Sequence, residues 1–242
     1  MLKTRCSQLK PTRPLILDAL RRPESFCAGP SLLPSGGKKE AAAGHETGAA
    51  ALEALFGNAA EARQRAEAAL ALSKGRDVQM QAAFALVAGN AVEAQALADD
   101  LAKHFPRDTV VQFIYLPILH AQLALSRKDS AKATEALQSA APYELGSAGG
   151  LYPVYIRGQA YLNARQGRHA AAEFQKVLEH RGIVVNEPIG ALANLGLARA
   201  YGLQGDTSKA RAAYQDFFTL WKNADPDIPI LKEAKTEYAK LQ

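Results

Sequence analysis

The chain has little cysteine, few aromatic residues and no long hydrophobic run, and each shortage excludes a class of protein. Its two cysteines, Cys6 and Cys27, both lie near the N-terminus, so no disulfide can join segments of the remaining chain. Their 21-residue separation, with no histidine nearby, matches no zinc-binding spacing. No stretch approaches 18 consecutive apolar residues, which predicts that these 242 residues contain no transmembrane helix.

The N-terminal end is also a poor match to a secretory signal peptide. Its apolar stretch Leu15-Ile16-Leu17 is ended by Asp18 and flanked by prolines. We therefore expect a cytoplasmic protein, unless a segment upstream of this sequence directs it elsewhere.

Aromatic residues make up 7% of the chain, whereas hydrophobic residues as a whole make up 48%. Alanine supplies much of the difference. A core rich in alanine suits helices that approach one another closely, and it suits the branched and aromatic interior of a sheet poorly. The composition therefore predicts an all-α fold.

The net charge of +5 comes entirely from one end of the chain. Residues 1–45 hold eight Lys or Arg against three acidic residues, and the other 197 residues hold 21 of each sign. A neutral body lacks the basic stripe that a phosphate backbone requires, which argues against nucleic-acid binding by that body. Prolines also recur through the N-terminal segment. We therefore expect a disordered, basic, Pro/Gly-rich tail over 1–45 and a folded domain over 46–242.

The body carries a repeat of 32 to 39 residues. Small or turn-forming dipeptides recur at these steps, at Gly57-Asn58, Gly89-Asn90, Lys128-Asp129, Gly167-Arg168 and Gly205-Asp206. An alanine follows each turn, at Ala62, Ala94, Ala133, Ala170 and Ala210. A repeat of this length holds two helices that cannot bury their apolar faces alone, so neighbouring pairs must stack.

Apolar periodicity predicts five helix pairs and one further helix. The pairs are expected at 46–56 with 59–73, 77–88 with 91–104, 108–127 with 130–141, 151–165 with 168–180, and 188–203 with 207–222. Pro117 falls inside one of these helices and predicts a kink or a broken start there. The last helix, 229–241, is amphipathic and is expected to cap the exposed end of the stack.

The repeats resemble the tetratricopeptide repeat, and the fifth matches it best, through Leu197, Ala198, Tyr201, Gly205, Asp206, Ala210 and Tyr214. The fourth repeat departs from the pattern because Gly167 comes two residues late, which predicts a longer first helix. The first departs through Glu53 at an aromatic position. The resemblance covers about 46–222. It implies a right-handed α-solenoid of about five helix pairs that binds a protein or peptide.

The C-terminal two-thirds resembles a narrower group, the repeat region that follows the catalytic domain of bacterial, eukaryotic-like serine/threonine kinases, notably in acidobacteria. The residues that carry this likeness lie at 143–146, 151–155, 180–184, 220–222 and 225–231. It implies an interaction module, for scaffolding, sensing or docking, of a bacterial signalling protein. The alternative is a fragment of a kinase whose catalytic domain lies upstream. Similar regions also follow winged-helix DNA-binding domains.

No combination of residues indicates catalysis. The kinase signatures are missing from this sequence, namely the Gly-rich loop with its lysine strand, the His-Arg-Asp loop and the Asp-Phe-Gly triplet. The five histidines lie apart, and none has a second histidine three or four residues further on that would form a metal pair. We therefore expect a non-enzymatic chain with no cofactor and no metal ion.

The inner face of such a stack, lined by the first helix of each pair, is the expected partner site. Polar and aromatic side chains that this register places there are Tyr115, Gln122, Tyr155, Gln159, Asn163, Asn194 and Arg199. Tyr115 and Tyr155 could equally fill gaps between helices. No lysine falls among these positions, which disfavours a peptide ligand held by its C-terminal carboxylate.

The register predicts that Ala210 lies where two helices cross most closely. Ala210→Leu should therefore overpack the crossing and lower the free energy of unfolding by about 1–3 kcal/mol, as measured by urea denaturation. Ala212→Leu, two positions around the same helix, is the control and should be nearly neutral. Equal losses at the two positions would contradict the register.

Overall fold

The computed structural model describes residues 35–146 and 148–241, and every regular element within these ranges is helical. In chain order the elements are α2 (Ser35–Phe56), α3 (Ala59–Leu72), α4 (Arg76–Leu86), α5 (Ala91–His104), η1 (Val111–Tyr115), α6 (Leu116–Ser126), α7 (Ser130–Ala136), η2 (Gln138–Tyr143), α8 (Tyr152–Asn163), α9 (Gly167–Glu179), α10 (Arg181–Val184), α11 (Ile189–Leu203), α12 (Thr207–Leu220) and α13 (Pro229–Ala239). The expected all-α class is confirmed.

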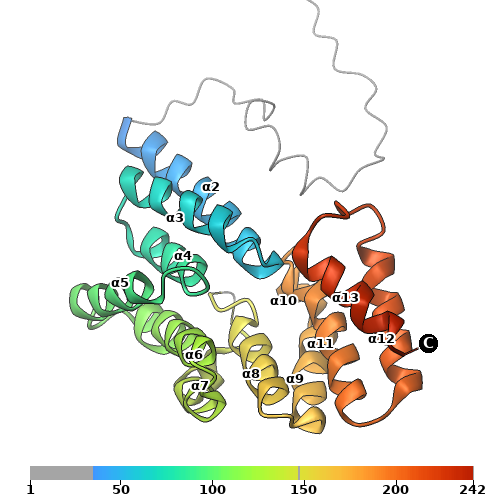
Figure 1. The fold of residues 1–242 in the computed structure, drawn as a ribbon. Helices are drawn as coiled ribbons and strands as arrows, with labels where there is room; N and C mark the ends of the chain where they lie inside the picture. The colour runs from blue at the N-terminus through green and yellow to red at the C-terminus, as the bar shows by residue number, and fades with distance from the viewer. Residues whose placement is uncertain (1–34, 147, 242) are drawn as a thin grey trace, which may run out of the picture.

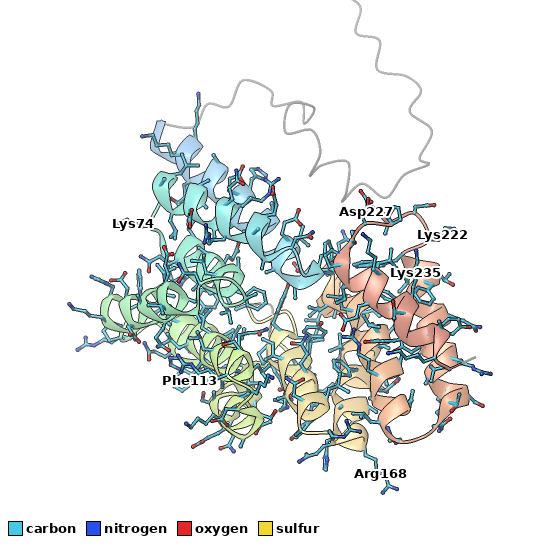
Figure 2. All side chains as sticks on the ribbon, in the orientation of Figure 1. Lys74, Phe113, Arg168, Lys222, Asp227 and Lys235 are labelled. Carbon is cyan, nitrogen blue, oxygen red and sulfur yellow. The ribbon has the colours of Figure 1, made fainter. Side chains whose placement is uncertain are left out.

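The helices follow one another along an arc, each packed on its neighbours in the sequence (Figure 1). Within the described ranges, no helix is both long and apolar enough to cross a membrane. Charged side chains such as Lys74, Arg168 and Lys235 extend outward from the helices (Figure 2). The hydrophobic core therefore lies between the helices of the arc.

Four of the turns that reverse the chain share one backbone geometry. At each, a residue with positive φ ends the first helix, namely Gly57, Lys128, Arg165 or Gly205. The next residue donates its N–H to the carbonyl five positions earlier, at 2.8–3.0 Å. The positive-φ residue donates to the carbonyl three positions before it. These two bonds define the Schellman motif, which satisfies the last carbonyls of a helix.

The turn of the fourth repeat corrects the expectation of a longer first helix. The turn is made by Arg165 and Gln166, in phase with the others, and α8 has already ended at Asn163. Gly167 instead begins α9, where a Cβ would lie 2.8 Å from the carbonyl oxygen of Ala200. Its position reflects close packing against α11 and has no part in the turn.

The alanine that follows each turn is fully buried, at Ala62, Ala94, Ala133, Ala170 and Ala210. In all five cases its N–H donates to the carbonyl four residues earlier, in the turn. The same small residue therefore occupies the first turn of each second helix. The steps between these alanines are 32, 39, 37 and 40 residues.

Helix α2 begins at Ser35, eleven residues before the expected start at 46. Residues 40–43 are good helix formers, and tertiary contacts hold this end of the helix. Ala43 is fully buried, and the Thr47 hydroxyl donates to Gln81 Oε1 at 2.7 Å. The folded domain therefore begins before residue 46, where the sequence analysis placed its start. The rest of the expected tail, residues 1–34, lies outside the described residues.

Pro117 has the effect on its helix that the sequence predicts. It lies in the first turn of α6, and the preceding turn, Val111–Tyr115, is a π-helix. The N–H of Leu116 donates to the carbonyl of Val111, five residues back. Proline has no N–H to continue the α-helical ladder, which explains the break at this point.

Helix α13 lies against α11 and α12, where the capping helix was expected. Arg199 Nε of α11 is 2.9 Å from Glu237 Oε2, and Arg199 Nη2 is 3.3 Å from Glu233 Oε2. The Tyr214 hydroxyl donates to the same Glu237 oxygen at 2.7 Å. These contacts attach α13 to the preceding pair.

The C-terminal end of α2 also meets the C-terminal part of the chain, at a contact we call the seam (Figure 1). The rings of Phe56 and Trp221 meet edge to face with centroids 5.0 Å apart. A Cβ at Gly57 would lie 3.1 Å from the Cβ of Pro229, so the two backbones pass closely. The seam joins the first described helix to the last.

Phe174 of α9 packs against two glycines in the C-terminal half. A Cβ at Gly158 of α8 would lie 2.8 Å from its ring, and a Cβ at Gly196 of α11 would lie 2.6 Å from it. The fully buried ring therefore fills a slot that exists only because both helices lack a side chain there.

Gly196→Ala should therefore lower the free energy of unfolding by about 1–3 kcal/mol, because the added methyl overlaps the Phe174 ring. Gly202→Ala, in the same helix with no atom within 4 Å of the added Cβ, is the control and should stabilise by up to about 1 kcal/mol. Urea denaturation monitored by circular dichroism measures both. A stabilising Gly196→Ala would contradict the tight slot.

Candidate interaction site

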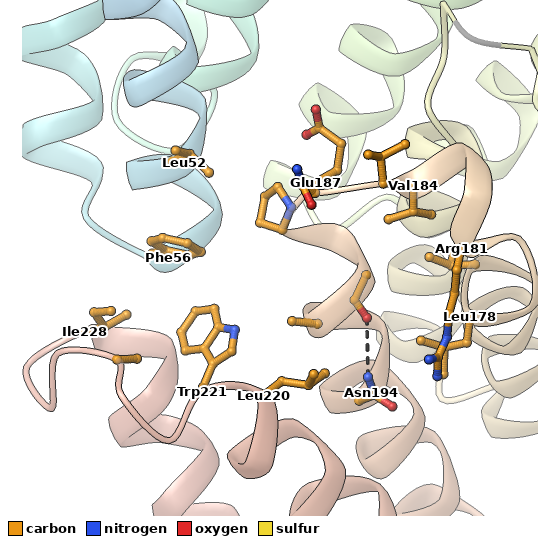
Figure 3. Close-up of a pocket in the computed structure, with 17 residues that line it drawn as sticks. Leu52, Phe56, Leu178, Arg181, Val184, Glu187, Asn194, Leu220, Trp221 and Ile228 are labelled. Carbon is orange, nitrogen blue, oxygen red and sulfur yellow. Dashed lines mark hydrogen bonds between the residues drawn. The ribbon is translucent and has the colours of Figure 1, made fainter. Parts of the chain in front are cut away.

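A cavity of about 370 Å³ opens beside the seam, and we call it the seam pocket. It lies between the end of α2, the segment from α9 to α11, and the end of α12 with the loop that follows (Figure 3). Its walls are mostly apolar and include Leu52, Phe56, Leu178, Val184, Trp221 and Ile228. The pocket therefore depends on elements from both ends of the described chain.

An aromatic cluster forms one wall of the seam pocket. Trp221 meets Phe56 at the seam, and its ring centroid is 4.9 Å from that of Phe217, which is fully buried. Both contacts restrict the position of the indole. Rigid aromatic walls of this kind are typical of sites that receive an apolar side chain from a ligand.

Polar groups are few around the seam pocket. Asn194 is buried, and its carboxamide donates to the carbonyl of Gly190 at 3.3 Å. Arg181 and Glu187 are both exposed. In the described ranges Arg181 has no ion pair, whereas Glu187 accepts a hydrogen bond from the Tyr152 hydroxyl at 2.9 Å. The edge thus presents one charge of each sign.

Two apolar side chains at the edge are exposed to solvent. Val185 is 72% exposed and Leu220 is 61% exposed. Val185 also has φ 50° and ψ −112°, a conformation that costs a β-branched residue about 1–3 kcal/mol. Exposed apolar groups and backbone strain at the same pocket both indicate an interaction site.

A second cavity, the side pocket, continues along α2 and measures about 440 Å³. It shares Leu52 and the loop 186–188 with the seam pocket, and Met80 and Phe84 of α4 form part of its wall. Tyr152 also lines it. Burial and the adjacent Glu187 raise the pKa of this phenol well above its ordinary value, so it is a hydrogen-bond donor at neutral pH.

The expected inner-face residues are spread over three places. Asn194 lines the seam pocket, and Tyr115 lines the side pocket. Asn163 and Arg199 line a separate hollow between α8, α11 and α13.

Several of these side chains have partners within the chain. Tyr115 donates to Asp77 at 2.9 Å and lies under the Arg76 guanidinium; burial and that hydrogen bond raise its pKa to about 12. Tyr155 is buried against Phe174 and accepts a hydrogen bond from Gln159, which supports its reading as a gap filler. Gln122 is half-buried.

The sequence analysis did not single out the seam pocket. Phe56, Val185 and Trp221 were not among the expected site residues, because neither residue type nor local pattern shows that positions 56 and 221 meet. The one available signal was that large aromatic residues are rare in the chain and that Trp221 is its single tryptophan.

Comparison with known proteins assigns this chain to no family. No family model, curated protein or solved structure matches this chain. Across residues 35–146 and 148–241, no group of three or more His, Cys, Asp or Glu side chains is placed to hold a metal ion. The candidate site is therefore defined by its geometry alone.

The strain at Val185 can be measured by removing the side chain. Val185→Gly should raise the free energy of unfolding by about 1 kcal/mol, because glycine adopts this backbone conformation without steric cost and little apolar burial is lost. Val92→Gly provides the control: Val92 is 83% exposed in α5, where glycine costs about 0.5–1 kcal/mol. Destabilisation by both substitutions would show that Val185 is not strained.

Proposed function

We propose that the chain is a protein-interaction module, a right-handed α-solenoid of tetratricopeptide-like helix pairs that binds an apolar segment of a protein partner. Three observations support the repeat arrangement. The turn geometry recurs, a buried alanine follows each turn at a regular step, and α13 lies against the last pair. Stacked helix pairs commonly present an extended binding surface.

The seam pocket is the observation that carries the proposal. Its aromatic wall is rigid, its edge exposes Val185 and Leu220, and its polar groups are few. The side pocket continues it along α2, so the two cavities form an elongated apolar surface rather than a single closed chamber. That shape suits the apolar face of a peptide or helix, which places successive side chains at regular intervals.

The setting in a bacterial signalling protein stays a prediction from the sequence resemblance. The same holds for the alternative, a kinase fragment whose catalytic domain lies outside this chain.

Capture from a bacterial lysate, with the chain immobilised, tests the proposed surface. Leu220→Asp places a charge at the pocket edge and should reduce recovery of the partner at least tenfold, since about 1.4 kcal/mol of lost apolar contact corresponds to that factor. Val92→Asp is the matched control, because Val92 is equally apolar and even more exposed on α5. Circular dichroism should show unchanged folding for both variants.

The same experiment separates the pocket from the inner-face residues. The double substitution Gln122→Ala, Asn163→Ala removes two side chains that were expected to contact the partner. Neither side chain makes a hydrogen bond within the described part of the chain. We expect this pair to leave capture unchanged. Loss of the partner in that variant, with retention in Leu220→Asp, would move the site to the inner face and contradict the proposal.

A further inference from the structure

The seam pocket leaves apolar side chains exposed at its edge, and the chain itself contains a segment of matching chemistry. We propose that residues 14–22 occupy the seam pocket as an intramolecular ligand, which a partner protein must displace. This inference rests on the proposed function, because it assigns a regulator to the same site.

The segment matches the pocket in both apolar content and charge. It reads Pro-Leu-Ile-Leu-Asp-Ala-Leu-Arg-Arg, with three consecutive large apolar residues and a fourth at Leu20. Asp18 provides a negative charge for Arg181 at the pocket edge. Arg21 and Arg22 provide positive charge for Glu187. Opposite charges beside an apolar contact favour one orientation of the bound segment.

The length of chain before α2 allows this segment to reach the pocket. From Ser35 to the pocket residues Leu52 and Phe56, α2 spans about 25–32 Å at 1.5 Å per residue. The 12 residues between 22 and 35 can extend to about 40 Å. The linker therefore reaches the pocket without being fully stretched.

The other apolar residues of the N-terminal segment fit less well. Leu32 and Leu33 are only two or three residues from Ser35, a reach of about 10 Å at most. Phe26 is a single apolar side chain that would need almost full extension of its eight-residue linker. Leu2 and Leu9 are isolated among polar and basic residues. Residues 14–22 thus combine sufficient reach with several adjacent anchors.

Attachment to the same chain makes even weak binding effective. A short flexible linker gives an effective concentration on the order of 1 mM. With an intrinsic Kd of about 100 μM, the ratio of occupied to empty pockets would then be about ten to one. The apparent affinity for a competing partner then falls by about the same factor, tenfold.

Trp221 is the only tryptophan of the chain and lines the pocket, so its fluorescence reports occupancy in the full-length protein. Leu17→Asp with Leu20→Asp should release the segment, shift the emission to longer wavelength and increase quenching by acrylamide. The control carries Leu2→Asp and Leu9→Asp, two substitutions of the same kind in the same N-terminal segment. Its emission spectrum should equal that of the unaltered protein. Identical spectra for all three proteins would overturn the proposal.

A synthetic peptide of residues 14–22 provides a second test. Added to the Leu17→Asp, Leu20→Asp protein, it should restore the original emission in a saturable titration, and it should fail to do so when Leu220→Asp is also present. In the full-length chain, Arg181→Glu should reduce the difference in emission from the Leu17→Asp, Leu20→Asp protein. Adding Asp18→Arg to the Arg181→Glu protein should restore that difference. Absence of any peptide response would overturn the assignment of the pocket.

Two further readouts identify the occupant. The emission of the unaltered protein should not depend on its concentration; a dependence would show that the segment binds a second copy, against the intramolecular proposal. If a partner is captured at Leu220, its binding should strengthen about tenfold in the Leu17→Asp, Leu20→Asp protein. Suppose instead that capture depends on Leu220, but that the Leu17→Asp, Leu20→Asp protein shows neither tighter partner binding nor a change in tryptophan emission. That result would support the proposed function and reject the intramolecular ligand.

Discussion

Close approach of helices at small residues determines the architecture of this chain. The five buried alanines let each second helix begin close against its neighbours. Glycines likewise allow α8 and α11 to pack closely around the Phe174 ring. A bulkier residue at such a crossing would separate the helices and disturb both adjacent pairs, since protein interiors are densely packed. The scarcity of aromatic residues is therefore a consequence of the packing, because little space remains between helices for large rings.

Three aromatic residues meet at a contact between helices that are distant in the sequence. Phe56, Phe217 and Trp221 meet at the seam, where the end of α2 reaches the loop after α12. These rings leave space beside the contact, and that space is the seam pocket. The candidate site thus arises from a change in packing along the arc, from small residues between adjacent helices to aromatic residues between distant ones.

Local signals in the sequence predicted most of the fold but little of the site. Glycine and alanine positions located four of five turns, and Pro117 located the irregular start of α6, because these effects act within a few residues. The fourth turn was placed two residues late because its positive-φ residue is Arg165, a residue type that rarely marks such a turn. The start of α2 at Ser35 depends on contacts with α4, and the pocket depends on contacts across the whole chain.

The seam also bears on how the protein folds. Most helices contact partners near them in sequence, which favours rapid and local assembly, whereas Phe56 and Trp221 are 165 residues apart. An open row of helix pairs is held together only by interactions between neighbours, so its ends can unravel independently. A contact that joins the two ends couples their stability, and the unfolding of either end is then opposed by the other.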